Sequence, residues 1–358
     1  MTKTPDRRFT ETILSWYGQN KRDLPWRQDR NPYHIWVSEI MLQQTRVEAV
    51  RDYYLRWMTA LPDFRALAEA EEETLLKLWQ GLGYYNRVRN LQAAAKEIME
   101  QHEGAFPTEF DKIRALKGIG DYTAGAIASI AFDQRTPAVD GNVLRVMSRI
   151  HADYSDVKSA ATKRRVTEQL AALYPEEGKG LCGDFTQGLI ELGAMVCVPN
   201  GRPQCEICPA ADWCRAKADG VQMELPIKAE KKARRIEERT VFILTSGNLE
   251  QGGKMAVGKR PAEGLLANLA ELPNLPGELT ADQALKQAED WGCSPTGLNR
   301  VAKFKHIFSH VEWHMTGYYI TCSQCGSGNS GGTEVFRWVS EEELEREVPL
   351  PSAFQYFL

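Results

Sequence analysis

Apolar residues recur at helical spacing through about the first 220 residues of the chain. This periodicity predicts helices over residues 6–17, 31–45, 51–60, 75–82, 87–101, 109–116, 122–132, 143–151, 159–174 and 184–196. Asn31 and Pro32 are suited to the cap and the first turn of the second of these helices. We therefore expect the first part of the chain to be all-α.

The pattern changes after this helical part. Residues 228–239, KAEKKARRIEER, form a charged stretch that we expect to link two domains. Beyond it, short apolar runs predict strands at 240–246, 317–322 and 334–339, and helices at 281–291 and after Ser340, whose spacing to Glu343 is that of a capping box. The Gly- and Ser-rich segment 326–332 is typical of a hairpin tip. The expected organisation is a helical domain (1–220), a linker (221–237) and a small α+β domain (238–358).

The composition is that of an ordinary folded protein. The 358 residues are enough for two cores, and 43% of them are hydrophobic and 26% charged. We expect a cytosolic protein, because no apolar run has the length of a membrane span and the N-terminal segment is too polar for a signal peptide. The net charge is −4, so any surface for nucleic acid must come from local arrangement.

A glycine-bracketed turn lies between the helices predicted at 109–116 and 122–132. Gly118 and Gly120 permit a tight hairpin, and the amides that open the following helix are suited to a phosphate oxygen. About twenty residues later, Asp140 stands at the start of the next predicted helix. Gly-Ile-Gly alone is more typical of an ordinary helix–helix turn, so its combination with Asp140 carries the interpretation as a nucleic-acid site.

Two other helix ends carry candidate chemistry. Glu39 lies among Trp36, Ile40 and Met41, where an unpaired carboxylate is costly, although a solvated helix face is the ordinary position for a glutamate. Gln43, Gln44 and Thr45 follow it and can hydrogen-bond to base edges. The loop GLGYYN (81–86) presents Tyr84 as a candidate wedge for a base stack, with core packing as the alternative.

Four cysteines lie close together in the sequence, at Cys197, Cys205, Cys208 and Cys214. The segment contains no histidine, and four thiolates suit either zinc or a 4Fe-4S cluster. Spacing alone does not choose between the two. Cys322 and Cys325 have no second pair nearby, and we expect surface thiols on a hairpin there.

Six segments together resemble the MutY-type adenine DNA glycosylases, iron–sulfur members of the helix-hairpin-helix superfamily. They are PYHIWVSEIMLQQT (32–45), GLGYYNRVRNL (81–91), LKGIGDYTAGAI (116–127), AVDGNVLRV (138–146), the cysteine segment and FKHIFSH (304–310). The resemblance implies an all-α helix-hairpin-helix glycosylase domain that holds a 4Fe-4S cluster, followed by an α+β Nudix-like domain. The first cysteine gap is seven residues where the family usually has six, and the Arg-Glu-x-x-Glu-Glu run of Nudix hydrolases is missing after residue 264.

The resemblance also implies the chemistry: removal of adenine opposite 8-oxoguanine, or opposite guanine, in double-stranded DNA. Glu39 would protonate adenine N7, and Asp140 would stay ionised at a helix N-terminus to stabilise the sugar cation. Tyr122 stands where the endonuclease III lineage has a lysine. A phenol cannot form a Schiff base, so we expect a monofunctional glycosylase that leaves an abasic site. Tyr122 would support the sugar cation or a transient sugar adduct.

The remaining site residues follow from the same resemblance. Trp26, Arg27 and Asp184 would line the pocket for the flipped adenine, and Gln44 and Tyr84 would hold the duplex open. The other expected DNA contacts are Thr45, Gly118, Gly120, Asn142, Phe308, Ser309 and His310, of which the last three would read the 8-oxoguanine. We expect a monomer in the bacterial cytoplasm that acts on the nucleoid and not at a membrane. An endonuclease III-type lyase and a non-catalytic DNA-binding module are the alternatives.

Overall fold

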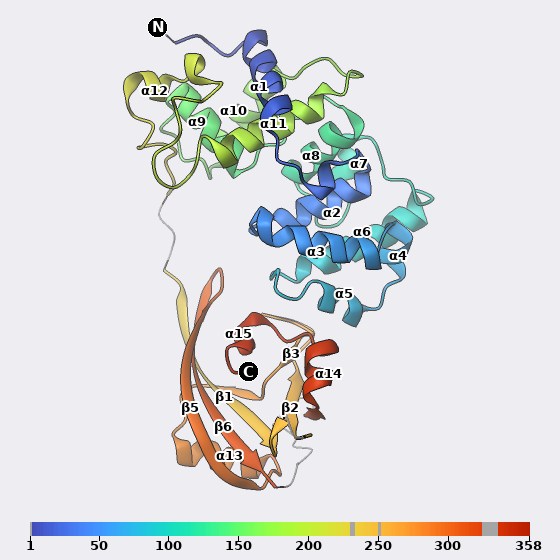
Figure 1. The fold of residues 1–358 in the computed structure, drawn as a ribbon, viewed down its shortest axis with the longest axis vertical. Coiled ribbons are helices and arrows are strands. Elements are labelled where there is room, and N and C mark those ends of the chain that lie inside the picture. The colour runs from blue at the N-terminus through green and yellow to red at the C-terminus, as the bar shows by residue number, and fades with distance from the viewer. Residues whose placement is uncertain (1, 230–232, 250–251, 324–335) are drawn as a thin grey trace. The chain divides into compact units, whose positions relative to one another are not determined.

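A computed structural model describes residues 2–229, 233–249, 252–323 and 336–358 of the chain. The chain forms two compact units (Figure 1). The first comprises Met1–Ala70 and Arg89–Glu230, and the second comprises Glu71–Val88 and Lys231–Leu358.

The first unit is built from helices, as the periodicity predicts. The α-helices that contribute to it are α1 (Arg7–Asn20), α2 (Pro32–Leu42), α3 (Val47–Ala60), α4 (Phe64–Glu69), α6 (Asn86–Gln101), α7 (Phe110–Ala115), α8 (Asp121–Phe132), α9 (Gly141–His151), α10 (Ala160–Ala171), α11 (Leu181–Met195) and α12 (Arg215–Asp219). Two 3₁₀ turns, η1 (Pro25–Arg27) and η2 (Ala211–Trp213), complete it. The predicted helices are confirmed with shifted ends. The short helices α4 and α12 were not predicted.

Helix α11 is the central packing element of this unit, in contact with α1, α8 and α9. Its glycines allow these close approaches. A Cβ at Gly183 would lie 2.7 Å from the Cα of Ile130 in α8, and one at Gly193 would lie 2.6 Å from the Cβ of Asn142 in α9. The close packing brings the start of α9, where Asp140 is the N-cap, next to α11.

The second unit is a mixed sheet with helices. The strands are β1 (Arg235–Ser246), β2 (Lys254–Lys259), β3 (Ala270–Glu271), β4 (Asn274–Pro276), β5 (Pro295–Ile307), β6 (Val311–Cys322) and β7 (Arg337–Val339). The sheet order is β3-β2-β1-β6-β5, with β1 and β6 parallel and β5 and β6 antiparallel, while β4 pairs with β1 and β7 with β2. The helices are α5 (Glu72–Leu78), α13 (Ala281–Asp290), α14 (Glu341–Arg346) and α15 (Ser352–Gln355).

Two apolar clusters stabilise this sheet. Ala284 and Ala288 of α13 pack with Phe242 of β1, and Phe354 and Phe357 near the C-terminus pack with another set of sheet residues. The capping boxes at the starts of α13 and α14 are both formed. The prediction from Ser340 and Glu343 is thereby confirmed.

Several expectations for the second part of the chain need correction. Residues 235–239, expected to belong to the linker, are the first residues of β1. Cys322 is buried, with 3% of its surface exposed, so it is not a surface thiol. Cys325 and the expected hairpin tip at 326–332 lie outside the described residues. Within those residues, no helix combines the length and apolar character that crossing a membrane requires.

Candidate active site

Glu39 is a buried acid on an apolar helix. Asn31 caps α2 by accepting from the amide of Tyr33, and the residues from Ile35 to Met41 are all buried. Only 8% of Glu39 is exposed. Burial raises the pKa of the Glu39 carboxyl to about 7, and the nearby charge of Asp140 adds to the increase. A carboxyl group with this pKa holds a proton for much of the time at neutral pH.

Tyr122, in the first turn of α8, is the hydrogen-bond partner of this acid. Its hydroxyl donates to Oε2 of Glu39 at 2.6 Å. Burial, together with the charges of Glu39 and Asp140, raises the pKa of Tyr122 well above its ordinary value. The phenol therefore stays protonated and orients the carboxyl group.

Asp140 caps α9, as the sequence predicts. Its Oδ1 accepts from the amide of Val143 at 2.8 Å and its Oδ2 accepts from Nδ2 of Asn142 at 2.7 Å. Burial nevertheless raises the pKa of Asp140, and the hydrogen bonds from Val143 and Asn142 offset this only in part. The net direction is opposite to the one expected from the helix N-terminus alone, because the sequence gives no measure of how deeply the cap is buried.

A cavity of about 1490 Å³ brings the three predicted catalytic residues together. Glu39, Tyr122 and Asp140 all line it. So do six of the predicted DNA and base contacts: Trp26, Arg27, Gln44, Thr45, Gly120 and Asn142. The cavity is larger than a typical small-molecule site and is lined by polar as well as apolar side chains. Its size and lining suit an extruded nucleotide.

Asp184 does not line this cavity. It lines an adjoining one of about 210 Å³, which shares Trp26, Arg27, Ile130 and Gln187 with the larger cavity. Asp184 also forms an ion pair with Arg30, with 3.6 Å between Oδ1 and Nη2. Asp184 therefore lies at the smaller cavity, which Trp26 and Arg27 also line.

The two glycines of the hairpin differ in their backbone. Gly118 has a φ of +82°, and a Cβ there would lie 2.6 Å from the Cβ of Asn90. Gly120, the N-cap of α8, has a φ of −100°, which any residue adopts, and a Cβ there would meet no protein atom within 4 Å. Gly118 is needed for the turn itself, whereas Gly120 leaves open space in front of the helix.

Gln44 and Tyr84 are both in left-handed backbone conformations, with φ of 62° and 49°. Both side chains are exposed. Such conformations are uncommon for residues with a side chain, and they concentrate at functional sites. Gln44 lines the cavity of about 1490 Å³.

Ser309 and His310 are exposed in the turn between β5 and β6, and Phe308 is partly buried. The Phe308 ring packs against Trp313 with 4.9 Å between ring centroids. Within the same unit, the hydroxyls of Tyr84 and Ser309 are 2.6 Å apart. Phe308 therefore anchors the turn, whereas Ser309 and His310 are accessible.

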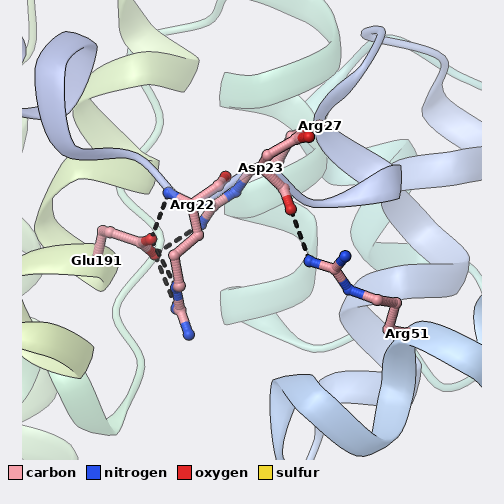
Figure 2. A network of polar contacts seen from close by, with 5 residues as sticks. All are labelled: Arg22, Asp23, Arg27, Arg51 and Glu191. Atoms are coloured by element: carbon pink, nitrogen blue, oxygen red, sulfur yellow. Dashed lines mark hydrogen bonds and ion pairs between the residues drawn. The ribbon is translucent and has the colours of Figure 1, made fainter.

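A buried ion-pair cluster next to the cavity was not predicted. The Glu191 carboxylate, on α11, accepts hydrogen bonds from Arg22 and Arg27 (Figure 2). The helix sequence LCGDFTQGLIELGAM carries the signal that singled out Glu39, a glutamate among apolar residues. The partners of Glu191, 164 and 169 positions away in sequence, could not be read from that local pattern.

The cysteine segment places its thiols near one another. Burial raises the pKa of the Cys208 thiol to about 12, and the neighbouring Cys197, Cys214 and Cys205 act on it in the same direction. None of the four is in a disulfide. Nη1 of Arg149 donates to Sγ of Cys197 at 3.2 Å. Across the described ranges, no three His, Cys, Asp or Glu side chains are arranged around a single metal ion.

Comparison with known proteins places the chain in a family. Residues 37–176 match the model of the HhH-GPD superfamily of base excision DNA repair proteins, and residues 245–358 match the NUDIX domain model. The chain is 36% identical to the adenine DNA glycosylase of Mus musculus, over 94% of this chain and 74% of the relative. It is also 36% identical to that of Homo sapiens, over 94% and 71%.

A further relative and two solved structures are also similar to the chain. The adenine DNA glycosylase of Buchnera aphidicola (subsp. Schizaphis graminum) is 30% identical over 88% of both chains. A thermostable thymine-DNA glycosylase superposes with a TM-score of 0.53 at 29% identity, over 60% of this chain and 97% of that one. An endonuclease III–DNA complex, at 22% identity and a TM-score of 0.50, covers 61% of this chain and all of its own and shares the fold. The chain belongs to the adenine DNA glycosylases, a family of DNA N-glycosylases that joins a helix-hairpin-helix domain to a Nudix-like domain.

Proposed function

We propose that this protein removes adenine paired with 8-oxoguanine, or with guanine, from duplex DNA by hydrolysis of the N-glycosidic bond. The product would be an abasic site for base excision repair. The observation that carries the proposal is the hydrogen bond of 2.6 Å from Tyr122 to Glu39, in a cavity that Asp140 also lines. Membership of the adenine DNA glycosylases identifies the base.

Glu39 acts as the general acid. It transfers its proton to N7 of adenine as the bond between N9 and C1′ breaks, and the bonding electrons leave with the base. A pKa of about 7, raised by burial, keeps enough of the acid form at neutral pH for this step. Water then adds at C1′ and gives up a proton, which restores the acid form of Glu39.

Asp140 and Tyr122 act on the sugar. The ionised form of Asp140 stabilises the developing cation, and its hydrogen bonds from Val143 and Asn142 oppose the increase in pKa that burial causes. The Tyr122 phenol cannot form an imine with C1′. The reaction therefore ends at the abasic site without nicking the strand.

Access to the bond requires base flipping, which costs roughly a few kcal/mol. Trp26 and Arg27 receive the extruded adenine, since both line the cavity that contains Glu39. Gln44 and Tyr84 hold the duplex open, and their left-handed backbones support a wedge role for these exposed side chains. Asp184 contributes from the adjoining cavity.

Ser309 and His310 read the opposite base. Both are exposed side chains that can donate and accept hydrogen bonds, and Phe308 anchors their turn on Trp313. The oxidised guanine differs from guanine by polar groups at N7 and C8, which such side chains distinguish. The 8-oxoguanine specificity rests on this turn.

Cys197, Cys205, Cys208 and Cys214 would hold a 4Fe-4S cluster. The donor set fits, because Cys197, Cys205 and Cys214 are close enough to raise the pKa of the Cys208 thiol and none of the four is in a disulfide. A 4Fe-4S cluster binds each thiolate to a different iron, so it does not require three ligands around one ion. When bound, the cluster would give structural cross-links to the segment from Cys197 to Cys214.

The test is a split assay on a labelled duplex with adenine opposite 8-oxoguanine. One half of the reaction receives alkali, and the other receives borohydride without alkali. We expect strand cleavage at the adenine only after alkali, no trapped adduct, and no activity from Glu39→Gln and Asp140→Asn. Nicking without alkali together with a trapped adduct would contradict the monofunctional mechanism, and failure to release adenine would contradict the function.

A further inference from the structure

Glu191 is a fully buried carboxylate among cations. Its side chain has no exposed surface, whereas those of Arg22 and Arg27 are 29% and 11% exposed. Burial alone would raise the pKa of Glu191, but the hydrogen bonds from Arg22 and Arg27 lower it to about 2. Glu191 is therefore ionised throughout the pH range in which the enzyme would act.

Both carboxylate oxygens of Glu191 have partners. Oε1 accepts from Nε of Arg22 at 2.7 Å and from the Arg22 amide at 3.1 Å. Oε2 accepts from Nη2 of Arg22 and from Nη2 of Arg27, each at 2.9 Å. One carboxylate thus orients two guanidinium groups and fixes the backbone where their loop begins (Figure 2).

The loop between these arginines is also tied on its other side. Nη2 of Arg51, from α3, donates to the carbonyl oxygen of Asp23 at 2.8 Å. Nη1 of Arg27 reaches back to the carbonyl oxygen of Arg22 at 3.3 Å. The loop that presents Trp26 and Arg27 is therefore fastened to α11 through Glu191 and to α3 through Arg51 (Figure 2).

We infer that Glu191 is a positioning residue of the base pocket, whose buried carboxylate holds Arg22 and Arg27 at the cavity wall that Glu39 shares. The inference rests on the proposed function, because it concerns the pocket in which adenine would be protonated. Glu191 itself does not line either cavity, whereas Arg22 and Arg27 line the larger one. It therefore acts through the two arginines.

The arrangement has an electrostatic consequence for Glu39. The groups that act on its pKa besides burial are Tyr122 from α8, Asp140 from the cap of α9 and Arg27 from η1. The residues Arg46 and Glu48, at the start of α3, line the same cavity. Arg27 favours the ionised form of Glu39. The negative charge of Glu191, paired with Arg27 at 2.9 Å, should offset part of that effect. Without this charge the Glu39 carboxyl would lose its proton at lower pH.

The test compares Glu191→Gln with wild type in single-turnover adenine release across pH. The loss of the Glu191 charge should displace Arg22 and Arg27 and so lower the rate of adenine release at neutral pH at least about tenfold. The alkaline limb of the pH profile should move to lower pH by about half a unit or more, because the charge of Arg27 is no longer balanced. Glu11→Gln is the matched control, since Glu11 pairs with Arg7 on the surface and both side chains are more than half exposed. It should leave the rate and profile unchanged.

Two further variants separate positioning from general stability. In an Arg27→Gln background, Glu191→Gln should lower the rate by a smaller factor than it does in wild type, because one of the two guanidinium groups that it positions is already gone. Glu191→Asp keeps the charge but shortens the side chain, so it should lower the rate while leaving the pH midpoint in place. It also carries the test if the glutamine variant does not fold.

The outcomes are distinct from those that test the proposed function. A wild-type enzyme that releases no adenine would contradict the proposed function. An active wild type beside Glu191→Gln and Glu191→Asp variants with unchanged rates and profiles would contradict this inference alone. A rate loss of Glu191→Gln that is just as large in the Arg27→Gln background as in wild type would also overturn it.

Discussion

The Tyr122 hydroxyl donates a hydrogen bond to the buried carboxyl group of Glu39, at 2.6 Å. The two residues are 83 positions apart and come from α8 and α2, which pack directly against each other. The tyrosine thereby orients the acid, and the direction of that hydrogen bond determines how the reaction should depend on pH.

Replacing Tyr122 with phenylalanine should move the alkaline limb of the pH–rate profile to higher pH. The hydroxyl donates to the ionised carboxylate and so lowers the pKa of Glu39. Its loss should raise the limb by up to about one pH unit and lower the maximal rate about tenfold, because the cation loses a supporting group. Single-turnover adenine release across pH measures both quantities. A limb that stays in place or moves to lower pH would contradict this role.

Replacing Glu39 with glutamine should stabilise the protein above neutral pH. The folded pKa of about 7 lies above the ordinary value of 4.5, so the stability of the wild type declines as pH rises from the lower value through the upper one. The advantage of the variant should be near zero at about pH 4 and reach up to about 3 kcal/mol at about pH 8. Urea unfolding at several pH values, with the exposed Glu11→Gln as a control, measures this difference. An advantage that does not vary with pH would argue against the raised pKa.

The two hairpin glycines should respond differently to alanine. Gly118→Ala places a Cβ against Asn90 at a positive φ, so it should destabilise the first unit by about 1–3 kcal/mol. Gly120→Ala meets open space at an ordinary φ, so stability should stay within about 0.5 kcal/mol. Its methyl group would instead lie in front of the α8 amides, and DNA binding should weaken.

Urea unfolding and fluorescence anisotropy with a labelled duplex separate these two effects. If Gly120→Ala binds DNA as tightly as wild type, the hairpin does not belong to the DNA interface. Gly118→Ala that unfolds like wild type would show that the turn tolerates a side chain.

Variants at Ser309 and Phe308 should change different properties, base recognition for Ser309 and stability for Phe308. Ser309→Ala leaves the apolar packing of the second unit intact, so it should reduce the preference for 8-oxoguanine over guanine without lowering stability. Phe308→Ala removes the ring packed on Trp313 and should cost about 1–2 kcal/mol. Adenine release from the two duplexes and unfolding of each variant test this division. Equal discrimination by Ser309→Ala and wild type would exclude Ser309 from reading the base.

The helices of the first unit could be predicted because their information is local. The buried face of each helix recurs at helical spacing, and the caps at Asn31 and Asp140 lie at the positions that the sequence indicates. The same holds for the capping box of α14. Strand β5 was missed because much of it is exposed, with Arg300, Lys303 and Lys305 among its residues, and its pairing with β6 is not a local property.

The candidate site also combines features that local sequence predicts with features that depend on distant contacts. Glu39 could be singled out because its neighbours in sequence are apolar, and an unpaired carboxylate among apolar residues is costly. The bond from Tyr122 and the clamp of Glu191 on Arg22 and Arg27 arise only when distant helices pack. The rise in the pKa of Asp140 was missed for a related reason, because its burial depends on elements far along the chain.

The central claim is that burial keeps Glu39 protonated so that it can serve as the acid. The most direct measurement is the single-turnover rate of adenine release by the wild-type protein from about pH 4 to about pH 9. We predict a rate that falls as pH rises through about 7, the pKa of Glu39. A rate that is constant across this range, or that already falls near the ordinary glutamate pKa of 4.5, would contradict the account.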